Sequence, residues 1–372
     1  MDTNQLALAR VERAVFGLRA LYSQYGYAQF KMSKFEEYDL YVRNKSFLVS
    51  DHVITFTDMG GKLMALKPDV TLSIVKNSRD LPGKVQKVYY DENVYRVPRG
   101  GLSYREIMQV GLECIGDIDT YCVAEVLTLA AKSLSQISED YVLDVSHLGV
   151  VAALIDRMGV SEEGRQRILS CVGEKNVPGI DGVLADEGID GAKAEALKRL
   201  MTANGDCEAT LAQLAKEKDC EEAAEALSNV LRAVRAVLPE GKIRIDFSVV
   251  NDMNYYNGIV FKGFVNGIPS SLLSGGQYDN LMRKMGKSSG AIGFAVYLDL
   301  LDELGNDVAE YDTDVVLLYD DDTDATAISC AVRDLVQAGE RVIARKTAPT
   351  KLKYKKLMRL ENGEVKTLET HA

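Results

Sequence analysis

Residues 106–116, EIMQVGLECIG, place two polar side chains with binding chemistry on a predicted β-strand. Alternate side chains of a strand point to opposite faces. One face is apolar throughout: Met108, Val110, Leu112 and Cys114. The other face carries an amide and a carboxylate, Gln109 and Glu113, on either side of Gly111. Two hypotheses remain open: this face meets water, or Gly111 leaves a hollow in which the two polar groups hold a ligand.

The elements around this strand predict an antiparallel sheet with helices. Residues 85–97 and 105–116 form one predicted antiparallel pair, and the apolar runs on either side of residues 59–62 predict a β-hairpin. Pro68 ends the hairpin, and Asp69 is placed to cap a helix over residues 70–77. Antiparallel hairpins separated by helices indicate an α+β fold.

Two further regions have their own character. Residues 150–238 are rich in Ala, Leu, Glu and Lys and predict a cluster of short helices. After Asp312 the pattern is strand, helix and strand, followed by the basic strip KLKYKKLMRL. For this strip we expect a solvated surface helix or strand, with RNA contact as the alternative.

Composition excludes several classes of protein. The chain has 372 residues, 47% of them hydrophobic, which is enough for a large core. Its formal net charge of −11 argues against an extended nucleic-acid surface. The six cysteines contain no CxxC pair and there are three histidines, so we expect neither a metal site nor disulfides. Without a signal peptide or an apolar run of ~18 residues, the chain is predicted to be cytoplasmic, with no membrane contact.

Five segments resemble the histidyl-tRNA synthetase core, a class II synthetase fold, in order along the chain: TFTDMGGKLMALKPDVT, NVYRVPRGGLSYREIMQVGLECIG, NYYNGIVFKGF, SGGQYDNLM and GAIGFAVYLDLL. The resemblance implies a synthetase-like core at 1–149 and 239–308, a helical insertion at 150–238, and a truncated anticodon-binding-like α/β tail at 309–372.

The resemblance also implies an amino-acid pocket that is largely intact. Its histidine-binding positions are Asp69, Thr71, Gln109, Glu113, Tyr255, Tyr256 and Tyr278. Adjacent tyrosines on a strand would be one core and one surface residue, so we expect Tyr256, which aligns with the imidazole-facing position, to be the better candidate. Gly111, Gly275 and Gly276 are expected to bring backbone close to the ligand, although a plain turn is the commoner use of Gly-Gly.

The positions that handle ATP in the family are altered. Arg96 matches the motif 2 arginine, but Pro98 stands where a glutamate is usual. Leu300 and Asn251 occupy positions that normally carry arginines near the phosphates. Preorganised positive charge usually contributes more than any other effect to catalysis of this kind, so we expect no catalytic residues, no cofactor and no synthetase activity.

A pocket with histidine contacts and without phosphate contacts resembles the regulatory subunits of ATP phosphoribosyltransferase. That resemblance implies a short-form catalytic subunit as partner, histidine as ligand, and a homodimer within a hetero-oligomer, with no tRNA binding. The alternatives are a divergent histidyl-tRNA synthetase or another histidine-activating ligase, and an RNA-binding protein that uses the basic tail.

Overall fold

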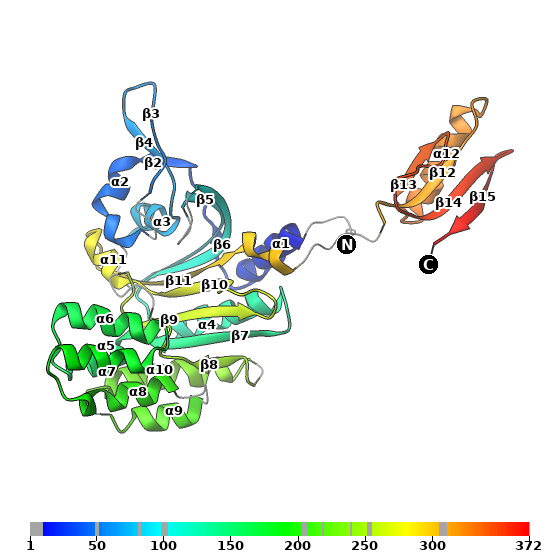
Figure 1. The fold of residues 1–372 in the computed structure, drawn as a ribbon. Coiled ribbons are helices and arrows are strands. Elements are labelled where there is room, and N and C mark those ends of the chain that lie inside the picture. Colours follow the sequence, from blue (N-terminus) through cyan, green and yellow to red (C-terminus); the bar gives the residue numbers. More distant parts are fainter. Residues whose placement is uncertain are drawn as a thin grey trace. The chain divides into compact units, whose positions relative to one another are not determined.

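A computed structural model describes residues 10–48, 52–80, 83–97, 103–202, 207–217, 219–238, 240–250, 255–304 and 311–371. These residues form two compact units, divided between residues 304 and 311 (Figure 1). No helix in the described ranges is long and apolar enough to cross a membrane.

The larger unit is built on an eight-stranded sheet in its described part, with the order β1-β5-β6-β11-β10-β9-β7-β8. The bounds in that order are Ala28–Gln29, Val85–Arg96, Arg105–Gly116, Gly290–Tyr297, Leu273–Gln277, Ile259–Val265, Tyr141–His147 and Ile243–Ile245. Neighbours from β5 to β7 are antiparallel, whereas β1 and β8 lie parallel to β5 and β7 at the edges. The predicted α+β class and the pairing of β5 with β6 are confirmed.

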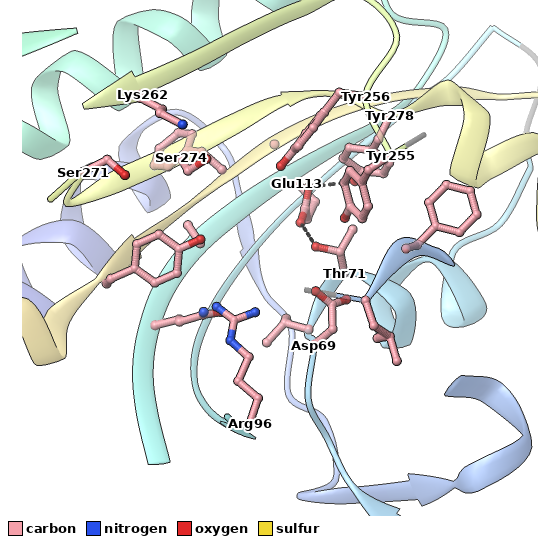
Figure 2. A pocket seen from close by; sticks show the side chains of 18 of the residues that line it. Asp69, Thr71, Arg96, Glu113, Tyr255, Tyr256, Lys262, Ser271, Ser274 and Tyr278 are labelled. Carbon is pink, nitrogen blue, oxygen red and sulfur yellow. Dashed lines mark hydrogen bonds between the residues drawn. The ribbon is translucent and has the colours of Figure 1, made fainter. Parts of the chain in front are cut away.

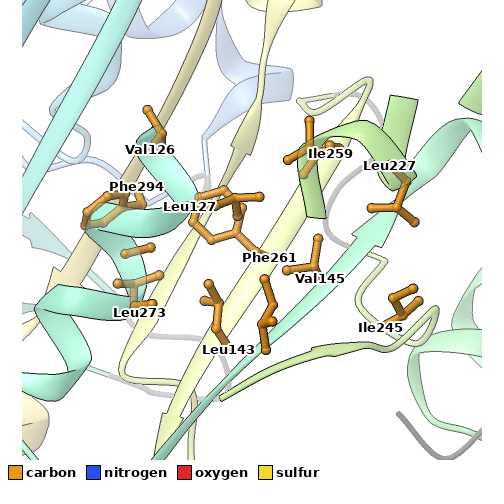
Figure 3. Packing of buried hydrophobic residues seen from close by; sticks show 14 of the residues in the cluster. Val126, Leu127, Leu143, Val145, Leu227, Ile245, Ile259, Phe261, Leu273 and Phe294 are labelled. Carbon is orange, nitrogen blue, oxygen red and sulfur yellow. The ribbon is translucent and has the colours of Figure 1, made fainter. Parts of the chain in front are cut away.

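One face of this sheet packs on the main hydrophobic core. Helix α1 (Arg10–Gln24) and helix α4 (Thr120–Ser135) contribute to that core, to which β6 adds its apolar side chains, Val110, Leu112 and Cys114. Figure 3 shows Val126 and Leu127 of α4 against the strand residues Phe261 and Phe294. Helix α4 begins where the Asp119 carboxylate accepts the Cys122 N–H at 2.8 Å, which satisfies one open donor of its first turn.

The helix-rich stretch forms the cluster of short helices that its composition predicted, and in the structure it extends the same core. Its elements are α5 (Leu148–Asp156), α6 (Glu162–Gly173), α7 (Val177–Asp186), η2 (Gly191–Ala194), α8 (Glu195–Thr202), α9 (Cys207–Leu214) and α10 (Glu221–Arg235). Each helix contributes buried apolar side chains to the main core, Leu227 of α10 among them (Figure 3).

A second layer covers the opposite face of the sheet. It contains α2 (Tyr38–Arg43), η1 (Lys45–Phe47), α3 (Thr71–Asn77), α11 (Asp279–Lys284) and a small sheet of β2 (Phe35–Glu37), β4 (Leu63–Leu66) and β3 (Thr55–Thr57). Strands β3 and β4 are the predicted hairpin. Because this layer lies over β6, Gln109 is only 5% exposed and Glu113 only 2%. The hypothesis that this face of β6 meets water is wrong.

The smaller unit is a four-stranded sheet with one helix in its described part. Its order is β13-β12-β14-β15, with β12 at Thr313–Leu318, α12 at Ala325–Gln337, β13 at Val342–Arg345, β14 at Tyr354–Glu361 and β15 at Glu364–Thr370. The predicted strand–helix–strand opening is confirmed. The basic strip becomes the inner strand β14, which buries Leu357 and Leu360 next to the half-buried cationic residues Lys356 and Arg359.

Gly111 provides a test of the packing between β5, β6 and β11. A methyl group at this position would lie 2.5 Å from the Tyr90 hydroxyl oxygen and closer still to the Phe294 carbonyl oxygen. We therefore expect Gly111→Ala to lower the free energy of unfolding by about 1–3 kcal/mol, the usual cost of overpacking, measured by urea denaturation.

Gly182→Ala is the matched control, since Gly182 lies in α7 and a methyl group there meets nothing within 4 Å. Equal stability of the two variants would contradict this account of the sheet.

Candidate functional site

A cavity of about 470 Å³ opens between the main sheet and its second layer. Its polar and aromatic lining includes Asp69, Thr71, Tyr90, Arg96, Gln109, Glu113, Tyr255, Tyr256, Lys262, Tyr278 and Tyr297. These residues come from α3 and the segment just before it, from strands β5, β6, β9 and β11, and from the segments that precede β9 and α11. The floor of the cavity is therefore the rigid sheet, and its walls belong to the covering layer.

All of the side chains that the sequence indicated for histidine line this one cavity, and so does Arg96. The expectation that one of the two adjacent tyrosines faces the core and the other the surface is wrong. Tyr255 and Tyr256 precede β9 in irregular backbone, and their ring centroids lie 4.5 Å apart. Tyr255 also lies 5.9 Å from the ring of Tyr278. Because the segment is not a strand, successive side chains do not have to alternate, and both rings reach the cavity.

Glu113 is the most constrained group of the site. Its two carboxylate oxygens accept hydrogen bonds from the Thr71 hydroxyl at 2.8 Å and from the Tyr278 hydroxyl at 2.7 Å (Figure 2). Burial raises the pKa of Glu113 to about 8, and the nearby Asp69 carboxylate acts in the same direction. The two hydroxyl bonds fix the position of the carboxyl group without supplying a positive charge to balance it.

Asp69 both caps helix α3 and lines the cavity. Its carboxylate accepts the Leu72 N–H at 2.8 Å, which confirms the predicted cap at the start of α3. Burial raises the pKa of Asp69, while the Leu72 N–H and the positive charge of Arg96 oppose that rise. The cavity thus contains two carboxyl groups that are costly to ionise, and a ligand with a cationic group or N–H donors would reduce this cost.

The three glycines expected near the ligand make room for protein side chains. The space beside Gly111 is filled by the ring of Tyr90. Gly275 and Gly276 lie inside strand β10 rather than in a turn, where Gly275 faces Phe261 and Gly276 faces the ring of Tyr256. Gly111 and Gly276 therefore shape the cavity through the tyrosines that they admit, whereas Gly275 makes room for a side chain of the main core.

Gly293 is a functional position that sequence reasoning missed. It lines the cavity and pairs with Glu113 across β11 and β6. Any side chain at Gly293 would collide with the Glu113 carboxylate. An isolated glycine in the predicted strand GAIGFAV was the available signal, because such a glycine often marks a close approach.

Of the positions that the resemblance associates with ATP, the described residues include Arg96 and Leu300. Arg96 is buried, at 7% exposed, and lines the cavity. Leu300 lies in η3 (Leu298–Leu304) and packs against the main core, and Tyr297 lines the cavity at the end of β11. Pro98 and Asn251 lie outside the described residues.

Sequence reasoning also missed three polar residues on the side of the cavity away from Glu113. Lys262, Ser271 and Ser274 lie together on one side of it, away from Glu113 (Figure 2). Among the described residues, no group of three or more His, Cys, Asp or Glu side chains is arranged to hold a metal ion.

Comparisons with known proteins agree with this architecture. The family model described as histidyl-tRNA synthetase matches residues 2–301. The ATP phosphoribosyltransferase regulatory subunit of Thermoanaerobacter pseudethanolicus is 31% identical over 291 residues, covering 76% of this chain and 75% of its own. The corresponding protein of Oceanobacillus iheyensis is 26% identical over 349 residues, covering 91% and 85%. The histidine–tRNA ligase of Methanocaldococcus jannaschii is 29% identical over 290 residues, covering 76% and 68%.

Two solved structures share the fold. An ATP phosphoribosyltransferase regulatory subunit/histidyl-tRNA synthetase from Bacillus halodurans superposes with a TM-score of 0.76 at 23% identity, covering 94% of this chain and 93% of its own. A chain of the ATP phosphoribosyl transferase (HisG:HisZ) complex from Thermotoga maritima superposes with a TM-score of 0.63 at 20% identity, covering 77% and 97%. The chain therefore belongs to the histidyl-tRNA synthetase family and, within it, to the ATP phosphoribosyltransferase regulatory subunits.

Proposed function

We propose that this chain is the non-catalytic regulatory subunit of a cytoplasmic ATP phosphoribosyltransferase, the enzyme of the first step of histidine biosynthesis. It activates a short-form catalytic subunit and carries feedback inhibition by histidine. The names of the relatives support a regulatory role, and the related Thermotoga chain was solved in a HisG:HisZ complex. As domains we propose a core at 1–149 and 239–308, an insertion at 150–238, and a truncated anticodon-binding-like tail at 309–372.

The observation that carries the histidine proposal is the buried Glu113 carboxyl group among aromatic rings. An imidazole N–H is a suitable donor to this carboxylate, and Tyr255, Tyr256 and Tyr278 provide the flat apolar surfaces for the ring. Asp69 is placed to pair with the ammonium group of the same ligand, with Gln109 and Thr71 as further polar partners. Each of these contacts relieves a cost that the empty pocket bears.

The phosphate side supports a receptor rather than an enzyme. A neutral Leu300 stands at the position of the family's motif 3 arginine and packs against the main core. The positive charge of Arg96 already acts on two acidic neighbours, since it lowers the pKa of both Asp69 and Asp299 against the effect of their burial. Loss of a single preorganised charge typically costs ~10²–10³ in rate. Losses at two or three positions would leave little adenylation.

The regulatory mechanism that we propose is linkage between ligand and partner. Histidine shifts the complex only by its differential affinity for the active and inhibited arrangements, typically ~1–3 kcal/mol of coupling. The pocket suits this role because Thr71 begins α3, Tyr278 precedes α11, and Glu113 lies on β6. A ligand held by all three would fix the covering layer on the sheet, and a homodimer within the hetero-oligomer would transmit that change.

The competing function is histidine activation by a divergent synthetase. The similarity to a histidine–tRNA ligase supports this alternative. We expect the purified chain to show no histidine-dependent exchange of pyrophosphate into ATP, because the charges for the phosphates are missing. We expect it to co-purify with the short catalytic subunit and to raise its activity in a histidine-sensitive way. Histidine-dependent exchange by the chain alone would refute the regulatory proposal.

Glu113→Gln tests the imidazole contact. The substitution keeps the shape of the side chain and removes the charge, so we expect histidine to bind about 1.5–3 kcal/mol more weakly, the range for a hydrogen bond to a charged group, measured by calorimetry. Glu125→Gln is the matched control: Glu125 is also buried, but it pairs with Lys87 at 2.6 Å and belongs to α4. Equal histidine affinity of the wild type and Glu113→Gln would show that the ligand contact is misassigned.

The pH dependence of binding tests the ionisation of the same group. With a pKa of about 8, Glu113 is largely protonated at pH 7 in the empty pocket. If the ring N–H binds the ionised form, binding releases a proton, and histidine affinity rises between pH 7 and 8 by about fivefold. The ring of free histidine, with a pKa of ~6.5, titrates below this window.

Calorimetry at pH 7 in two buffers of different ionisation enthalpy measures the released proton directly. We expect Glu113→Gln to release nearly one proton fewer than the wild type. Proton-neutral binding to the wild type would contradict the assigned ionisation.

A further inference from the structure

The three tyrosines at the Glu113 end of the cavity come from two segments that one asparagine joins. Tyr255 and Tyr256 lie in residues 255–258, which form neither helix nor strand, and Tyr278 lies between β10 and α11. The asparagine that directly follows Tyr256 reaches the second segment with both its backbone and its side chain. Because no strand ladder sets the course of residues 255–258, the spacing of the rings depends on this contact.

Asn257 holds the residues on either side of Tyr278. Its backbone N–H donates to the Gln277 carbonyl oxygen at 3.1 Å. Its side-chain amide donates to the Asp279 carboxylate at 2.9 Å, and its side-chain oxygen accepts the Asn280 N–H at 3.4 Å. Tyr278 is thus held in place by bonds that its own ring does not make.

Asp279 connects the same contact to the main sheet. It is the first residue of α11, yet both of its carboxylate oxygens accept hydrogen bonds from outside that helix. One accepts the Asn257 amide, and the other accepts the N–H of Ala291 in β11 at 2.9 Å. The Ala291 carbonyl oxygen in turn accepts the Tyr278 N–H at 2.9 Å. The segment that carries Tyr278 is therefore fixed both to Asn257 and to a strand of the cavity floor.

Strand β11 gives the rings and the Glu113 carboxyl group a common reference. Ala291 and Gly293 are two residues apart on β11, so they lie on the same face of the sheet, roughly 7 Å from each other. Gly293 adjoins the Glu113 carboxylate, whereas Ala291 holds Asp279. Figure 2 shows the labelled tyrosines beside Glu113. A change in the Asp279 contacts would therefore move the rings relative to Glu113.

We propose that Asn257 and Asp279 are positioning residues of the ligand site: their side-chain pair sets where the tyrosine rings hold a ligand against Glu113. The proposal rests on the proposed function, because the ligand ring that it concerns is the imidazole of histidine. Neither Asn257 nor Asp279 is among the described residues that line the cavity, so both act through the tyrosines next to them.

An exchange of the two side chains tests this pair without a change in net charge. In Asp279→Asn, one amide oxygen has to serve two donors, the Ala291 N–H and the Asn257 amide, so one contact is lost. In the double variant Asn257→Asp/Asp279→Asn, the residue at 279 accepts from Ala291 and donates to the carboxylate at 257, so both contacts return. The second oxygen of that carboxylate can still accept the Asn280 N–H.

Asp140 and Asn266 form the matched control pair. The Asn266 amide donates to the Asp140 carboxylate at 2.9 Å, the same distance as between Asn257 and Asp279. The control pair is exposed and joins the residue before β7 to the residue after β9. Neither of its members is among the described residues of the cavity lining.

The experiment is calorimetry of histidine binding to the full chain, with thermal melting to establish that each variant is folded. We expect Asp279→Asn to weaken histidine binding roughly tenfold and the double variant to recover most of that loss, as for residues in direct contact. Asp140→Asn and Asp140→Asn/Asn266→Asp should bind histidine as the wild type does. If Asp279→Asn is not folded, Asn257→Ala, which removes both side-chain contacts, takes its place with the same expected loss.

A combination with Glu113→Gln separates positioning from a general loss of stability. Effects on independent sites are additive, so a general loss would leave the cost of Glu113→Gln unchanged. A displaced ligand ring no longer meets Glu113. In the Asp279→Asn background we therefore expect Glu113→Gln to weaken histidine binding less than about threefold, against roughly tenfold to a hundredfold in the wild type.

The proposal is overturned if Asp279→Asn binds histidine as the wild type does, if the double variant recovers nothing, or if Glu113→Gln costs the same in both backgrounds. If histidine does not bind the wild type at all, the proposed function fails instead, and near-UV circular dichroism tests the positioning of the rings. The chain has 18 tyrosines and no tryptophan, so that signal comes mainly from tyrosine. A signal that changes in Asp279→Asn and returns in the double variant supports the positioning role, and an unchanged signal overturns it.

Discussion

The burial of the Glu113 carboxyl group is the constraint on which the site depends. A carboxyl group 2% exposed is costly to ionise, and its pKa of about 8 expresses that cost. The protein accommodates the group by three means. Gly293 provides the space beside it, Thr71 and Tyr278 donate to its two oxygens, and the covering layer keeps water away. Removal of any of these would move the carboxyl group or expose it to water. Gly293, Thr71 and Tyr278 therefore influence the site through the position of Glu113.

The sheet serves two purposes with its two faces. The apolar residues of β6 join the main core below α4, and the polar residues of the same strand reach the cavity. Strand β11 repeats this division: Gly293 and Ala295 line the cavity, and Phe294 between them belongs to the main core and borders the cavity as well. The helix-rich stretch stabilises the first face. The cavity floor is therefore held by the largest core of the molecule, which gives the site a fixed geometry.

Charge is distributed unevenly in the cavity, and this supports a binding role. Glu113 and Asp69 lie at one side with raised pKa values, and Lys262 with its neighbouring serines lies at another. Arg96 lies close enough to Asp69 and Asp299 to oppose the rise in their pKa values that burial causes. Such a pocket suits the binding role that we propose. Its described lining lacks the excess positive charge that stabilises a phosphoryl-bearing transition state.

The α+β class, the antiparallel pairs, the helix-rich stretch and the Asp69 cap were all predictable from local pattern, because period-two alternation, turn residues and capping act over a few neighbours. The site residues were named from motif resemblance, and the structure brings their side chains to one cavity. Pattern alone left the polar face of β6 undecided, because alternation is the same whether water or a second layer covers it. The positions of Gly293 and Lys262 depend on strand register. Gly293 lies beside Glu113 and Lys262 lines the cavity, although both belong to strands that are distant from β6 in the sequence. Sequence thus determined which elements form and which chemistry is available, and tertiary packing decided which groups are buried together, because burial is a property of contacts between distant segments.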